Sequence, residues 1–77
     1  LSAVFERTIS RYGKRGNRYV PMDVGHAGEN IYLQCVALNL GTVAVGAFRD
    51  EEVHQALGLP ETEHPMYIMP IGHPAYR

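Results

Sequence analysis

Hydrophobic residues are densest between Asp23 and Phe48, where they recur with the spacing of an α-helix. Asp23 is a suitable N-cap, because its carboxylate accepts hydrogen bonds from the first backbone N–H groups, and Gly41 is a suitable stop. We therefore predict a helix over residues 23–40. It is apolar around most of its circumference, so we expect another subunit or further parts of its own domain to cover one side. Two rows of side chains carry the pattern, namely Ala27, Ile31, Cys35 and Leu38, and Leu33, Val36, Ala37 and Leu40.

A short strand and a second helix are predicted directly after this helix. Residues 42–45 are rich in β-branched side chains, and Gly46 follows at the strand end. Because glycine has no Cβ atom, backbone at Gly46 can lie close to a flat ligand. Asp50 then caps a second helix that Gly58 ends, with Leu59 folding back over its last turn.

The last part of the chain predicts another strand. Residues 66–71 are nearly all apolar, which is typical of a strand covered on both faces, and Pro70 confines it to an edge or an end. A strand, a helix and a second strand within about 30 residues fit the size of a βαβ unit, although other connections fit too.

The first part of the chain is less regular. Residues 1–5 predict the end of a strand, and residues 6–12 predict either a short helix or an irregular continuation. Gly13 and Gly16 then mark a loop. A short extended piece is expected at residues 18–22, where Pro21 breaks the register.

Length limits what the chain can do alone. Its 77 residues, 45% of them hydrophobic, indicate one folded domain at most. A domain of this size buries only about 60% of the surface of its unfolded chain, which leaves it marginally stable. Since the chain starts at Leu1 and is apolar from its first residues, we expect residues 1–77 to be one piece of a larger subunit.

Charge is divided unevenly along the chain. Residues 1–20 hold five Arg and Lys against Glu6, a balance of +4, whereas residues 21–77 hold two Arg against seven acids, a balance of −5. A basic block of this kind is found in nucleic-acid and phosphate surfaces. The glycines of YGKRGNRY favour a solvated, turn-rich loop instead, so we do not expect a nucleic-acid partner.

Few residues carry recognisable chemistry. The chain has a single cysteine, Cys35, so it has no internal disulfide framework and no Cys/Cys or Cys/His spacing typical of a zinc site. Cys35 fits an inert core thiol in a reducing, cytoplasmic setting. No apolar run reaches the roughly 20 residues that span a bilayer. His26 begins GHAGE, which lacks the second histidine of a metalloprotease HExxH motif, and the other histidines are scattered, so we predict no metal site. Tyr12 and Tyr19 flank the basic loop, where they either anchor it or carry a proton.

Four segments, taken together, resemble the C-terminal part of nitroreductase-like FMN oxidoreductases, and specifically the SagB-type dehydrogenase branch. They cover nearly the whole chain, and the helix start GH, the LG–strand–GAF stretch and the closing PIGHP are jointly specific. In order, they are RYGKRGNRY at 11–19, DVGHAGENIYLQCVALNLGTVAVGAF at 23–48, LGLP at 57–60 and PMYIMPIGHP at 65–74.

The resemblance implies an α+β fold, the C-terminal part of a three-layer α/β/α sandwich with a long buried dimer-interface helix. It implies a homodimer through the 23–40 helix, with two FMN sites at the interface. The segment that would pass alongside the flavin ring is Ala44, Val45, Gly46 and Ala47, with a backbone N–H near the glycine reaching the N5/O4 edge. Arg77 is the candidate basic residue for the FMN phosphate.

Two departures from the branch pattern affect the chemistry. Glu29 stands where Gln is common, and Arg11-Tyr12 stands where azoline-oxidising members carry Lys-Tyr. Arginine is always protonated and cannot act as a base, so Tyr12 is the remaining candidate catalytic residue, as an acid or proton carrier. The expected function is hydride transfer through FMN from NAD(P)H to an unassigned acceptor. The alternatives are a non-enzymatic dimerisation or binding module with a basic loop, and a remnant without cofactor.

Overall fold

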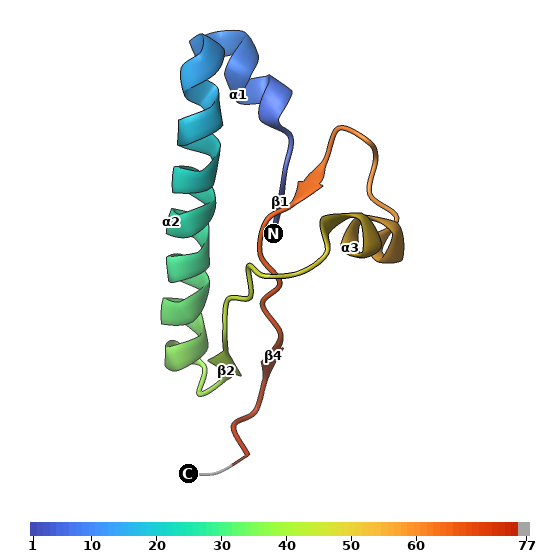
Figure 1. Ribbon diagram of the computed structural model, residues 1–77. Helices are drawn as coiled ribbons and strands as arrows, with labels where there is room; N and C mark the ends of the chain where they lie inside the picture. Colours follow the sequence, from blue (N-terminus) through green and yellow to red (C-terminus); the bar gives the residue numbers. More distant parts are fainter. Residues whose placement is uncertain (76–77) are drawn as a thin grey trace.

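The computed structural model describes residues 1–75. One long helix, α2, runs along one side, and the C-terminal segment lies beside it (Figure 1). The shorter helix α1 folds back at the N-terminal end of α2, and α3 lies off to the other side. The elements in chain order are β1 (Ser2–Ala3), α1 (Phe5–Tyr12), a 3₁₀ turn η1 (Gly13–Arg15), α2 (Gly16–Ala37), β2 (Gly41–Thr42), α3 (Asp50–Leu57), β3 (His64–Pro65) and β4 (Ile71–Gly72).

Helix α2 begins at Gly16, seven residues before the predicted cap, so the predictions of a cap at Asp23 and of an extended piece at 18–22 are wrong. Pro21 lies inside the helix and removes one intrahelical hydrogen bond. Packing against α1 offsets this loss. Gly16 lies against Ile9 of α1, and the rings of Tyr12 and Tyr19 meet edge to face at 5.4 Å between centroids.

The end of α2 also differs from the prediction of a stop at Gly41. The helix ends at Ala37, and Asn39 takes the left-handed conformation with φ of 59°. The Leu40 N–H donates to the Cys35 carbonyl at 2.8 Å, which closes the last turn in the way that a glycine usually allows. Gly41 belongs to β2 instead.

The strands pair antiparallel, so the chain does not form a βαβ unit. β1 pairs with β3, and β2 pairs with β4, where Gly41 lies opposite Gly72 and Thr42 opposite Ile71. An isolated bridge between Val45 and Ile68 continues the second pairing. The predicted strands at 42–45 and 66–71 therefore lie side by side but are broken, because Pro70 has no N–H to donate.

Among the other predicted elements, the loop marked by Gly13 and Gly16 is wrong, because Gly13–Arg15 form η1 and Gly16 begins α2. The short elements before it and after α2 are largely confirmed. Residues 5–12 form the short helix α1, and residues 2–3 form β1. The second helix, α3, is present, but the prediction that Asp50 caps it is wrong, because Arg49 occupies the cap position and Asp50 is the first helical residue. Gly58 ends α3 in the left-handed conformation, with the Leu59 N–H donating to the His54 carbonyl at 3.1 Å.

The core within residues 1–75 is small. Val20 and Cys35 are its buried apolar side chains, and Cys35 is a free thiol as predicted. The opposite face of α2 leaves Met22, Leu33 and Val36 exposed, with Val36 at 74%. Within residues 1–75, no helix is both long enough and apolar enough to cross a membrane.

Candidate functional site

Residues 44–47, predicted as the cofactor-binding segment, lie between α2 and the C-terminal segment. Val45 and Ile68 exchange both backbone hydrogen bonds, at 2.8 and 3.0 Å. The N–H of Ala44 donates to the hydroxyl oxygen of Tyr32 on α2 at 2.7 Å. The segment is thus fixed from both sides, and its first two N–H groups are already used.

The next two backbone N–H groups, those of Gly46 and Ala47, are free to bind a ligand in the part of the chain that the structure describes. Within residues 1–75, no hydrogen bond occupies the N–H of Gly46 or Ala47, and both residues are exposed. Two successive N–H groups at the exposed end of a fixed segment are suited to bind an acceptor edge of a ligand. This donor set fits the carbonyl and ring nitrogen of a flavin, a group that the sequence resemblance implies.

Gly46 packs against the ring of Tyr67 within the chain. A Cβ atom added at Gly46 would lie 3.6 Å from Cε1 of Tyr67, which is ordinary contact. A Cβ added at Gly28 on α2 would lie 3.5 Å from Cδ2 and Cε2 on the other edge of the same ring. The Tyr67 ring therefore separates α2 from Gly46, a contact that the sequence pattern does not indicate.

Tyr12, the candidate catalytic residue, lies at the corner between α1 and α2. Tyr12 is 53% exposed, and the Arg11 guanidinium lies 5.6 Å from its ring centroid. Tyr12 also lines a hollow of about 450 Å³ together with Thr8, Tyr19, Met22, Asp23 and His26. His26 thus shares a surface with Tyr12, which its position in the sequence did not reveal.

The structure does not bring Tyr12 to residues 44–47 within one chain. Tyr12 contacts Tyr19, whereas Ala44 contacts Tyr32, and these two α2 residues are about 20 Å apart at a rise of about 1.5 Å per residue. Figure 1 shows α1 at the opposite end of α2 from β2. Arg77, predicted for the FMN phosphate, lies outside the described residues.

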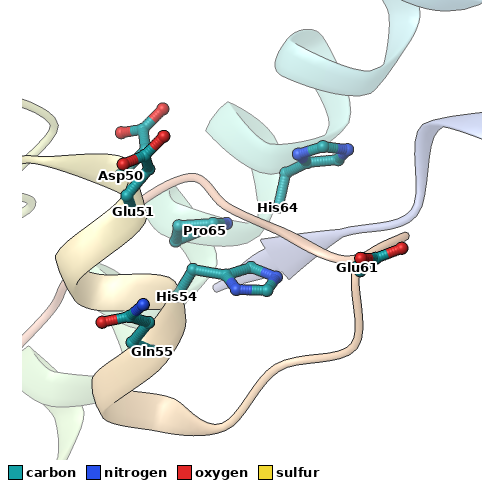
Figure 2. A pocket seen from close by; sticks show the side chains of 7 residues that line it. All are labelled: Asp50, Glu51, His54, Gln55, Glu61, His64 and Pro65. Carbon is teal, nitrogen blue, oxygen red and sulfur yellow. The ribbon is translucent and has the colours of Figure 1, made fainter.

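A second hollow, of about 610 Å³, lies between α3 and the loop that leads to β3 (Figure 2). His54 and His64, which are scattered in the sequence, both line it, together with Asp50, Glu51, Gln55, Glu61 and Pro65. Nε2 of His54 lies 2.8 Å from the Pro60 carbonyl, and the His64 ring meets Phe5 edge to face. Within residues 1–75, no three His, Cys, Asp or Glu side chains are grouped to hold a metal ion.

The basic residues of the first part of the chain lie on its surface. The ion pair that the structure shows within residues 1–75 joins Arg49 and Glu52 at 3.3 Å, and both side chains are largely exposed. The basic side chains before residue 20 take no part in an ion pair in the same region, and all are exposed: Arg7, Arg11, Lys14, Arg15 and Arg18.

Comparison with known proteins gives one consistent result. Residues 1–73 match the Nitroreductase family. A protein of Methanocaldococcus jannaschii with the provisional name nitroreductase is 49% identical over 72 residues, which are 94% of this chain and 35% of that protein. The chain therefore spans about a third of the length of this curated relative.

Two crystal structures share the fold. A provisionally named nitroreductase from Ralstonia eutropha matches with a TM-score of 0.84 and 26% identity over 99% of this chain and 36% of its own. Another, from Anabaena variabilis, matches with a TM-score of 0.83 and 38% identity over 95% of this chain and 15% of its own. The α+β arrangement of a long helix with small sheets is therefore nitroreductase-like, and the chain belongs to the nitroreductase family.

Proposed function

We propose that residues 1–77 are the C-terminal portion of an FMN-dependent NAD(P)H oxidoreductase subunit. Membership of the nitroreductase family supports a flavin-dependent oxidoreductase. The observation that carries the proposal is the pair of backbone N–H groups at Gly46 and Ala47, which are exposed and have no partner within residues 1–75.

FMN supplies hydride transfer at its ring nitrogen N5, and this chain supplies the surroundings of that edge. The N–H groups of Gly46 and Ala47 would donate to the N5/O4 edge and stabilise the negative charge of the reduced ring. Ala44 and Val45 would contribute contact surface rather than donors, because Tyr32 and Ile68 already accept their N–H groups. Arg77 would hold the phosphate.

Tyr12 would deliver a proton to the acceptor, although Arg11 stands where azoline-oxidising members of the SagB-type branch carry lysine. The Arg11 guanidinium near its ring cannot take a proton, so Tyr12 is the group able to move one at this corner. Because Tyr12 and Gly46 are far apart in one chain, they would act on the same ligand only if different subunits supply them.

A homodimer through α2 would satisfy that requirement. The exposed face of α2 carries Met22, Leu33 and Val36, with Leu33 at 60% and Val36 at 74% exposure. Apolar groups in such a row are typical of an interface helix rather than of a solvated one. We propose that this face contacts the second subunit in a three-layer sandwich, and that the enzyme works in the cytoplasm, where its free thiol Cys35 would stay reduced.

The test is the visible spectrum of the full-length subunit after FMN is added and unbound FMN is removed. We expect a bound flavin band that NADH or NADPH bleaches. Ala47→Pro should raise the Kd for oxidised FMN by up to about tenfold, because it deletes one hydrogen bond worth about 0.5–1.5 kcal/mol. Ala47→Ser keeps the N–H and is the matched control. A full-length subunit that stays colourless would contradict the proposal.

The exposed basic residues favour one alternative, a binding module for polyanions. In that case, affinity for a single-stranded oligonucleotide should fall steeply between 50 and 200 mM salt, by roughly 300-fold for about six phosphate contacts. Binding of this kind by a protein that takes up no FMN would favour the alternative over the oxidoreductase.

A further inference from the structure

Two tyrosines from different parts of the chain hold residues 44–47 at a fixed distance from α2. The hydroxyl oxygen of Tyr32 accepts the Ala44 N–H at 2.7 Å, and this contact is partly buried. The ring of Tyr67 fills the space between Gly28 and Gly46, with one edge toward each glycine. The Tyr32 hydrogen bond therefore holds the segment near α2, and the Tyr67 ring limits how closely the segment approaches the helix.

This arrangement determines where the next two donors lie. Ala44 is two residues before Gly46, and the Val45–Ile68 backbone pair lies between them. Once the N–H groups of Ala44 and Val45 are used inside the chain, the segment has little freedom to rotate. Donors that are held in place before a ligand arrives stabilise developing charge without the cost of reorganisation.

We propose that Tyr32 is a positioning residue for the flavin edge, with Tyr67 as its spacer. The proposal rests on the proposed function, because it assigns a purpose to the geometry at Gly46 and Ala47. Tyr32 touches neither substrate nor flavin in this view. It acts through the Ala44 N–H and thereby sets how well Gly46 and Ala47 stabilise the reduced flavin relative to the oxidised one.

The experiment compares Tyr32→Phe with Tyr67→Phe in the full-length subunit. Tyr32→Phe removes the oxygen that accepts the Ala44 N–H and leaves the ring. Tyr67→Phe is the matched control, because it also removes a phenol oxygen beside the same segment, and no hydrogen bond to residues 1–75 uses that hydroxyl. Melting temperatures of both variants establish that they are folded.

The first measurement is amide hydrogen exchange at Ala44 in the protein without FMN. We expect exchange in Tyr32→Phe to be about three- to tenfold faster, because a net hydrogen bond of about 0.5–1.5 kcal/mol is lost, and unchanged in Tyr67→Phe. Equal protection in Tyr32→Phe and the unsubstituted protein would overturn the proposal. This measurement does not depend on whether FMN binds.

The second measurement is the reduction potential of bound FMN. If Tyr32→Phe weakens binding of reduced FMN about fivefold more than binding of oxidised FMN, the two-electron potential falls by about 20 mV, since tenfold corresponds to about 30 mV. Faster exchange with an unchanged potential would overturn the positioning role while the proposed function stands. An unsubstituted subunit that binds no FMN would instead refute the proposed function, and the positioning role with it.

Discussion

Replacing Gly16 by alanine should destabilise the protein, although alanine is normally the better helix residue. Gly16 is the first residue of α2, with φ of −54°, so its backbone suits any L residue. The obstacle is steric. An added Cβ would lie 2.9 Å from both the backbone nitrogen and Cγ1 of Ile9, and 3.0 Å from Ile9 Cα. Two of these three atoms are backbone, so a change of side-chain rotamer cannot relieve the contact.

The size of the effect follows from two opposing terms. Overpacking at a closely packed contact costs about 1–3 kcal/mol. Alanine gains up to about 1 kcal/mol over glycine inside a helix, and less at its first residue. The net loss in the free energy of unfolding should therefore be about 1–2 kcal/mol. In a protein of 150–250 residues, a loss of this size lowers Tm by about 2–8 °C.

Gly25→Ala is the matched control, because Gly25 lies in the same helix and a Cβ there meets no atom of the described chain within 4 Å. It should stabilise the protein by about 0.5–1 kcal/mol. Urea unfolding of the full-length subunit, followed by far-UV circular dichroism, measures both changes. If Gly16→Ala is as stable as Gly25→Ala, then α1 and α2 do not pack as closely as the structure shows, and the reasoning is refuted.

Two further predictions concern residues near the candidate site. Thr42→Val should leave the free energy of unfolding unchanged or raise it by about 1 kcal/mol, because the buried Oγ1 of Thr42 has no hydrogen-bond partner within residues 1–75. A loss above about 1 kcal/mol in urea unfolding would show that the hydroxyl is bonded in the full-length subunit. Tyr12→Phe should slow turnover of the acceptor by about 100-fold or more in stopped-flow experiments and leave flavin reduction by NAD(P)H unchanged, as a proton carrier requires. Tyr19→Phe, the neighbouring ring, serves as the control for that measurement, and equal effects of the two substitutions would argue for a packing role.

The sequence predicted the existence of the long helix but not where it begins and ends. Asp23 and Gly41 are good local signals for a cap and a stop, and Pro21 is a good local signal for a break. Each was overridden by a feature of the folded chain that a linear pattern does not contain. At the N-terminal end, α1 packs against Gly16. At the C-terminal end, Asn39 adopts the left-handed conformation that ends the helix, two residues before Gly41.

The candidate site was predicted only as a segment. β-branched residues followed by Gly46 indicated a strand end, and the structure places Val45 in a backbone pair with Ile68. Nothing in the sequence indicated that Tyr32 accepts the Ala44 N–H, since a tyrosine on a mostly apolar helix fits a packing role equally well. The direction of pairing was also hidden, because the length of a connection alone does not distinguish antiparallel from parallel strands.

The two faces of α2 explain why the chain has a defined candidate site and yet so small a core. On the packed face, Gly28 leaves room for the Tyr67 ring, which in turn contacts Gly46. On the other face, Leu33 and Val36 are exposed, and burying one such side chain contributes about 1.5–3 kcal/mol. Contacts on the packed face set the geometry of residues 44–47, whereas much of the stability has to come from whatever covers the exposed face. The same helix thus connects the proposed subunit interface to the proposed flavin edge. For this reason, loss of the interface should also disturb the positions of the donors at Gly46 and Ala47.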